Sequence, residues 1–152
     1  MEVWRLTSAR YPGLDGEGAR RYGGRWNKIG TALVYTAGTQ SLAILEYMVH
    51  ADSDILPTNV VVREANIPGD LQIETISVND LPTGWREPLD HPALQAIGTD
   101  WVNRHSSAVL RVPSAIVPME HNYLLNPMHR AFAKITWTNP VPFTLDPRLF
   151  TR

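Results

Sequence analysis

The sequence contains no cysteine among its 152 residues. Disulfide bonds, thiolate metal sites and cysteine nucleophiles are therefore excluded together. A strong charge of either sign is also missing, since 14 Lys and Arg residues nearly balance 15 Asp and Glu residues, for a formal net charge of −1. Because nonspecific binding to nucleic acid needs a clear cationic excess, we expect no direct nucleic-acid binding.

Long hydrophobic runs are absent too. No segment approaches the roughly 20 apolar residues that a membrane span needs, and residues 1–5 have neither the cationic start nor the apolar core of a signal peptide. We therefore expect a cytoplasmic protein with no membrane partner. The chain has no internal repeat, charge block or low-complexity tract. The sequence predicts a single domain over residues 1–152.

Several motifs of common catalytic and binding sites are missing. The five histidines, His50, His91, His105, His121 and His129, include no pair at the one-turn spacing of a helical zinc site. We therefore expect no metal. Ser114 lacks the glycine-flanked elbow of serine hydrolases. The chain also lacks the dinucleotide-binding G-x-G-x-x-G motif and the glycine-lysine-serine/threonine phosphate loop.

The order of predicted elements indicates a mixed α/β (α+β) domain with an antiparallel-rich sheet. We predict strands over residues 3–7, 31–36, 59–67, 71–77, 134–138 and 141–145, with a hairpin turn over 68–70. Helices are predicted over 40–50, capped by Thr39, and over 92–105, capped by Asp90. Residues 8–30 and 120–129 are predicted to be loops, residues 81–88 irregular, and residues 108–112 and 115–118 short apolar runs.

Three residues on one short stretch carry the candidate chemistry. Arg25 follows two glycines, which let the backbone approach a ligand, and its guanidinium can donate paired hydrogen bonds to a phosphate. Tyr35 ends a predicted strand and can stack on a base or a nicotinamide ring. Glu46 lies at the edge of the apolar face of helix 40–50, where a carboxylate can stabilise an oxocarbenium-like sugar. Together they favour a nucleotide-cleaving enzyme.

Each of the three also has a structural interpretation. Arg25 could be a surface arginine packed on Trp26. Tyr35 could be a core residue at the end of its strand. Glu46 could be a rim glutamate paired with His50, one helical turn further on. The residues taken singly leave these alternatives open.

An ordered set of short segments runs through about residues 3–145. They are Trp4-Arg5, Gly23-Gly24-Arg25-Trp26-Asn27, Tyr35, Leu42-Ala43 with Leu45-Glu46, Val112-Pro113-Ser114, and Asn122-Tyr123-Leu124-Leu125-Asn126-Pro127-Met128-His129. No single segment is specific, but in this order the set resembles the RES domain, the toxin of bacterial RES–Xre toxin–antitoxin pairs.

The resemblance implies a fold related to ADP-ribosyltransferases, with a split β-sheet core and flanking helices. NAD is then the substrate, and no separate cofactor is expected. Arg25, Glu46 and Ser114 match the three residues that name the family, and Tyr35 matches its active-site tyrosine, so these four are the expected catalytic residues. The expected NAD-binding residues are Arg5, Arg25, Tyr35, Asn126 and His129.

For function, the resemblance implies a toxin that arrests growth by cleaving the nicotinamide–ribose bond of NAD, by hydrolysis or phosphorolysis. Its expected partner is a cognate Xre-type helix-turn-helix antitoxin. Two alternatives stay open, namely transfer of ADP-ribose to a specific protein and a catalytically silent nucleotide-binding module. The joint presence of Arg25, Glu46 and Ser114 argues against the silent module, because binding alone does not need a carboxylate near the ribose.

Overall fold

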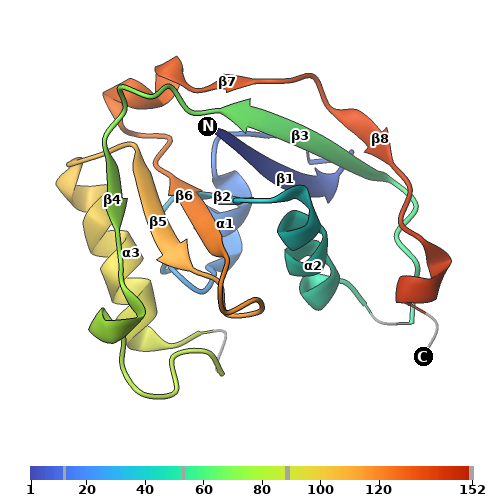
Figure 1. Cartoon of the computed structure of the whole chain (residues 1–152), viewed down its shortest axis with the longest axis horizontal. Coiled ribbons are helices and arrows are strands. Elements are labelled where there is room, and N and C mark those ends of the chain that lie inside the picture. The colour runs from blue at the N-terminus through green and yellow to red at the C-terminus, as the bar shows by residue number, and fades with distance from the viewer. Residues whose placement is uncertain (12, 53, 88–89, 151–152) are drawn as a thin grey trace.

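A computed structural model describes residues 1–11, 13–52, 54–87 and 90–150 of the chain (Figure 1). Its strands and α-helices are β1 (Glu2–Ser8), α1 (Glu17–Tyr22), β2 (Val34–Ala37), α2 (Gln40–His50), β3 (Val60–Asn66), β4 (Ile73–Thr75), α3 (Pro92–Arg104), β5 (Val109–Pro113), β6 (His121–Leu125), β7 (Thr136–Trp137) and β8 (Val141–Phe143). Short 3-10 helices are η1 (Val78–Asp80), η2 (Arg130–Lys134) and η3 (Pro147–Leu149). Within the described ranges, no helix has both the length and the apolar character needed to cross a membrane.

The strands form one eight-stranded sheet in the order β4-β5-β6-β2-β1-β3-β7, with β8 also paired to β3. Every pairing is antiparallel except that of β4 with β5. The sheet is nearly divided in its middle, because β1 and β2 share only the pair Trp4↔Ala37. Figure 1 shows the two halves turned against each other, with β5 and β6 steep and β1 and β3 flatter. The split, antiparallel-rich α+β fold is confirmed.

Both α2 and α3 cover the same face of β2. Successive side chains of a strand point to opposite faces, so Tyr35 and Ala37 share one face. Ala37 belongs to the apolar cluster formed with Leu42 of α2, whereas Tyr35 packs against the cluster that contains Trp101 of α3. The face of β2 that carries Tyr35 and Ala37 is therefore covered by α3 at Tyr35 and by α2 at Ala37.

Several predicted elements are confirmed, with small shifts at their ends. Strand β1 and helix α2 match the predicted ranges, and Thr39 caps α2 by accepting a hydrogen bond from the Leu42 N–H over 3.1 Å. Helix α3 is also present, but its cap is His91 rather than Asp90. The His91 Nδ1 atom accepts the Ala93 N–H over 3.2 Å, so the prediction of Asp90 is wrong by one position.

The predicted hairpin between the strands over 59–67 and 71–77 is wrong. The chain does turn after β3, where the Leu71 N–H donates to the Pro68 carbonyl oxygen over 3.1 Å. However, β3 already has β1 on one edge and β7 and β8 on the other. With no free edge on β3, β4 crosses to the far end of the sheet and pairs in parallel with β5.

Two predicted loops contain regular structure. Residues 120–129 include β6, an inner strand whose Leu124 and Leu125 are both buried. Because both of its faces are covered, β6 lacks the alternation that identifies a half-buried strand.

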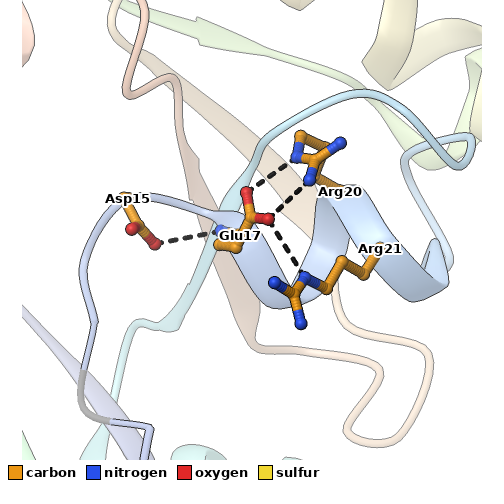
Figure 2. Close-up of polar contacts among 4 residues, drawn as sticks. All are labelled: Asp15, Glu17, Arg20 and Arg21. Carbon is orange, nitrogen blue, oxygen red and sulfur yellow. Dashed lines mark hydrogen bonds and ion pairs between the residues drawn. The ribbon is translucent and has the colours of Figure 1, made fainter.

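Residues 8–30 include α1, a short helix with no buried residue and so no apolar periodicity. Figure 2 shows the Glu17 carboxylate bonded to both Arg20 and Arg21, one turn ahead on this helix. These bonds lower the pKa of Glu17 to about 2. The helix begins after Gly16, which has a φ of 73°. A Cβ on Gly16 would lie 2.5 Å from the Leu33 nitrogen, so this position excludes a side chain.

Candidate active site

The loop that carries Arg25 is fixed at both ends by one buried side chain, Asn27. The Asn27 Nδ2 group donates to the carbonyl oxygens of Ala19 over 2.8 Å and Thr31 over 3.1 Å. Its Oδ1 atom accepts the Tyr35 hydroxyl over 2.6 Å. A buried amide with this many partners holds the loop in one conformation. The position of Arg25 is therefore determined by α1 and β2 together.

Helix α3 also packs closely against this loop. A Cβ on Gly98 would lie only 1.8 Å from the Trp26 carbonyl oxygen, so this helical position must be glycine. Next to it, the Lys28 N–H donates to Thr99 Oγ1 over 3.0 Å, and Gln95 Nε2 donates to the Gly24 carbonyl oxygen over 3.2 Å.

Gly24 faces Tyr35 rather than open space. A Cβ on Gly24 would lie 2.6 Å from the Tyr35 hydroxyl oxygen. The glycine pair was expected to let the backbone approach a ligand, and the structure shows that Gly24 makes room for the tyrosine instead.

Tyr35 uses its hydroxyl group inside the protein. The O–H group donates to Asn27 Oδ1, and its oxygen accepts the Trp26 N–H over 3.0 Å. Burial raises the pKa of Tyr35, so the phenol stays protonated across the physiological range. What Tyr35 offers to a ligand is the ring and not the hydroxyl group.

The Arg25 guanidinium has the Glu46 carboxylate as a nearby group of opposite charge. Its Nη1 donates to the Trp85 carbonyl oxygen over 2.9 Å. Burial lowers the pKa of Arg25, and the nearby Glu46 and Tyr35 act in the opposite direction. Arg86 lowers the same pKa further, and it directly follows Trp85, whose carbonyl oxygen Arg25 contacts. The structure thus brings Arg25, Tyr35 and Glu46 together, as the sequence predicts.

Glu46 reaches the site from α2 and is half-buried. Its Oε1 atom accepts the Asn122 Nδ2 group over 2.7 Å. Among the described residues its hydrogen-bond partner is Asn122 on β6 and not His50. The alternative of a rim glutamate held by His50 is therefore replaced by a carboxylate held by the sheet.

Ser114 is buried immediately after β5, with 1% of its surface exposed. Its Oγ atom accepts the N–H groups of Ile116 over 3.1 Å and Val117 over 3.0 Å, so it organises the turn that leads to β6. Two accepted bonds leave the hydroxyl hydrogen for one donated bond. The same turn contacts α2, because Thr39 Oγ1 donates to Glu120 Oε1 over 2.6 Å.

Arg5 joins the two halves of the sheet. Its Nη1 donates to the Tyr35 carbonyl oxygen over 2.9 Å. Burial lowers the pKa of Arg5, and Asp15 opposes that effect. The Nε atom is buried and has no hydrogen-bond partner among the described residues. Arg5 therefore lies beside Tyr35, as its assignment to the site requires.

Asn126 and His129 make no hydrogen bond with Arg25, Tyr35 or Glu46 in the described part of the chain. Asn126 is fully buried, and its Nδ2 donates to the Val102 carbonyl oxygen over 3.2 Å. It directly follows β6, two residues beyond Leu124, the partner of Tyr35 in the sheet. His129 caps η2 and lines a separate hollow of about 800 Å³ beside the end of α3, whose lining does not include Arg25 or Glu46. The NAD-binding roles of Asn126 and His129 stay predictions.

The sequence assigns no role to two residues of the site. Asn122 lies in a predicted loop, where it is the first residue of the segment 122–129 that resembles the RES domain. Arg86 lay in an irregular segment with no motif. Its Nε and Nη2 atoms both donate to the Ala115 carbonyl oxygen, over 3.0 and 2.9 Å. Within the described part of the chain, no cluster of three or more His, Asp or Glu side chains could hold a metal ion.

The sequence pattern of the RES domain matches residues 2–146, which include every site residue described above. The chain belongs to the RES domain family. The RES domain here is 40% identical over 152 residues to a protein named Toxin Res from Photorhabdus laumondii, covering 98% of this chain and 97% of that relative. It is 37% identical over 156 residues to the Prs ADP-ribosylating toxin of Sphingobium sp. (strain YBL2), covering 98% of this chain and 96% of that protein.

A solved structure supports the fold independently. The RES domain is similar to a chain in the crystal structure of the M. tuberculosis MbcT–MbcA toxin–antitoxin complex, with a TM-score of 0.74 and 20% sequence identity. The similarity covers 98% of this chain and 86% of that chain. At this level of identity the similarity concerns the fold. The family expected from the ordered segments is thus confirmed, and its relatives are toxins.

Proposed function

We propose that this RES domain is the toxin of a bacterial toxin–antitoxin pair and that it cleaves the nicotinamide–ribose bond of NAD. The observation that carries the proposal is the convergence of Arg25, Tyr35 and Glu46 from a loop, a strand and a helix. The names of the relatives, which include toxins and one ADP-ribosylating toxin, agree with this chemistry.

The phosphate end of NAD is assigned to the guanidinium groups. The positive charge of Arg86 lowers the pKa of Arg25, so Arg25 is exposed to a like charge in the free protein. A pyrophosphate carries two negative charges and accepts paired hydrogen bonds from guanidinium groups, so it relieves this repulsion. Arg5 is assigned a supporting contact, because its Nη1 donates to the Tyr35 carbonyl oxygen and its buried Nε has no hydrogen-bond partner among the described residues.

The reacting end is assigned to Tyr35, Glu46 and Ser114. The tyrosine ring packs against the nicotinamide, and the Ser114 hydroxyl donates its remaining hydrogen to the ribose or to the nicotinamide amide. When the C–N bond breaks, positive charge develops on the ribose, and the Glu46 carboxylate stabilises that charge more in the transition state than in the ground state. Nicotinamide leaves as a neutral molecule, so no strong general acid is needed. Water or phosphate then forms the new C–O bond.

The test is the release of nicotinamide from NAD by purified protein, with water, phosphate or cell extract present. Losing one well-placed electrostatic contact lowers such rates by about 10² to 10³, so Arg25→Ala and Glu46→Ala should each lose activity to that extent. Arg148→Ala and Asp146→Asn are the matched controls, because these two side chains form an exposed ion pair with each other at η3. A folded wild-type protein that releases no nicotinamide under any of these conditions would refute the proposal.

A second candidate is transfer of ADP-ribose to a protein, which the name of the Sphingobium relative favours. It uses the same bond cleavage with a different acceptor. Label from the adenylate part of NAD would then appear on a macromolecule in cell extract, and nicotinamide release would depend on that extract.

The proposed partner is an antitoxin of the Xre type, since an NAD-cleaving enzyme must be restrained in its own cell. The similar solved structure is itself a toxin–antitoxin complex. Co-expression of the adjacent gene should restore growth, and its product should copurify with this chain. Growth arrest that persists although a helix-turn-helix protein copurifies would count against inhibition by such an antitoxin.

A further inference from the structure

Asn122 lies on β6 with its amide group turned toward α2. Its Nδ2 donates to Glu46 Oε1 over 2.7 Å. An ionised carboxylate only accepts hydrogen bonds, so the NH₂ end of the amide must face Glu46. The Oδ1 end consequently points away from Glu46. Among the described residues this buried oxygen has no hydrogen-bond partner.

The backbone of Asn122 is held on both sides by the sheet. It pairs with Val112 of β5 and with Ala37 of β2. A side chain mounted on an inner strand has a narrower range of positions than one on a loop. Helix α2 is held at its first turn by the Thr39 cap and by the buried Leu42. The Asn122 amide therefore connects a rigid strand to the one carboxylate of the proposed reaction.

We propose that Asn122 positions Glu46 against the nicotinamide ribose and that its Oδ1 accepts a hydrogen bond from a ribose hydroxyl of NAD. This inference rests on the proposed function. A buried carbonyl oxygen without a partner is unfavourable, and a sugar hydroxyl supplies the missing donor. The ribose carries two adjacent hydroxyl groups, and a carboxylate beside an amide oxygen offers one acceptor to each.

The test compares Asn122→Ala and Asn122→Asp with wild type in the nicotinamide-release assay. Thr36→Val is the matched control, because Thr36 Oγ1 also makes a buried hydrogen bond, to the Tyr123 carbonyl oxygen over 2.6 Å. Thr36 and Tyr123 are the neighbours of Ala37 and Asn122 in the two strands and point to the opposite face. Misplacing a reacting group by about 1 Å costs about 10²-fold in rate, so Asn122→Ala should lower kcat by roughly 10- to 100-fold. Thr36→Val should keep the wild-type kcat.

The pH dependence of activity in Asn122→Asp distinguishes the positioning of Glu46 from a purely structural role of Asn122. Two carboxyl groups at hydrogen-bond distance share one proton and hold it to a higher pH than a lone carboxyl group does. While that proton is held, the carboxyl group introduced by Asn122→Asp still donates a hydrogen bond to Glu46. Activity should therefore be substantial at low pH and fall as the pH rises. Of the other groups near Glu46, Arg25 stays charged and Tyr35 stays neutral over this range.

The outcomes separate the inference from the function on which it rests. A wild-type enzyme that releases nicotinamide, with both Asn122 variants matching Thr36→Val at every pH, would overturn the role of Asn122 and leave the function standing. A folded wild type that releases none would overturn both. If Asn122→Ala does not fold, the pH profile of Asn122→Asp, which keeps the size of the side chain, decides alone.

Discussion

Tyr35 donates its hydroxyl hydrogen to Asn27 Oδ1 over 2.6 Å, and this buried bond joins β2 to the loop that carries Arg25. Tyr35→Phe removes it and also leaves the Trp26 N–H without its acceptor. Leaving buried polar groups unpaired costs about 1–3 kcal/mol, so the free energy of unfolding in urea should fall by that amount. Tyr22→Phe, at a tyrosine 80% exposed, is the control and should unfold like wild type. Equal stability of the two variants would contradict the bond.

The same tyrosine makes stability depend on alkaline pH. Burial raises the pKa of Tyr35 in the folded state, whereas an unfolded tyrosine titrates near pH 10. The stabilising contribution is therefore complete below about pH 10 and is lost as the pH rises toward the folded pKa. Urea unfolding at a series of pH values should show this loss in wild type and a smaller loss in Tyr35→Phe. Equal losses of stability in wild type and Tyr35→Phe between pH 9 and the alkaline end of the series would refute it.

How much the sequence predicts depends on how far apart the interacting residues lie in the chain. Arg25, Tyr35 and Glu46 fall within one loop, strand and helix that follow one another, and their convergence is predicted. The Thr39 cap is equally local. The partner of Glu46 is 76 residues away, and the Trp85 carbonyl oxygen that Arg25 contacts is 60 residues away. No local pattern encodes such pairs.

The errors in the predicted elements have a similar origin. Strand β6 is covered on both faces, so its sequence does not alternate, and the route from β3 to β4 depends on which sheet edges are already occupied. Occupied edges and covered faces are properties of the assembled sheet. The composition of a single segment cannot reveal them.

Close packing between α3 and the Arg25 loop predicts a large effect for Gly98→Ala. A Cβ at 98 would meet the Trp26 carbonyl oxygen at 1.8 Å, which forces backbone to move. Overpacking of this kind costs about 1–3 kcal/mol or more, and the thermal unfolding midpoint should fall accordingly. Gly18→Ala in α1 is the matched control, since nothing lies within 4 Å of its Cβ position and alanine favours a helix. A drop in stability for Gly18→Ala, with none for Gly98→Ala, would contradict this packing.

Ser114→Ala separates a structural role from a catalytic one. Losing the acceptor for the Ile116 and Val117 N–H groups should lower stability by about 1–2 kcal/mol. If Ser114 also contacts NAD, kcat should fall well below that of Ser107→Ala, another buried serine, whose Oγ accepts the Trp101 Nε1–H over 2.9 Å. Both rates are measured well below the unfolding temperature. Equal kcat values for the two variants would show that Ser114 only stabilises the turn after β5 and does not contact NAD.

The proposed contact of Arg86 with the pyrophosphate of NAD predicts which kinetic constant the Arg86 variants change. If Arg86 helps to bind the pyrophosphate, it acts on NAD in the ground state and the transition state alike, so Arg86→Ala should raise KM more than it lowers kcat. A charge-assisted hydrogen bond is worth about 1.5–3 kcal/mol, so the rise in KM should be at least about 10-fold. Arg86→Lys keeps the charge but loses the paired donors to the Ala115 carbonyl oxygen, and it should recover only part of the affinity for NAD.

The same contact predicts a dependence on salt. Because the charge of Arg86 acts on Arg25 and salt screens such charges, the KM of wild type should rise with salt more steeply than that of Arg86→Ala. An Arg86→Ala enzyme with a wild-type KM would leave the phosphate contact to Arg25 and Arg5.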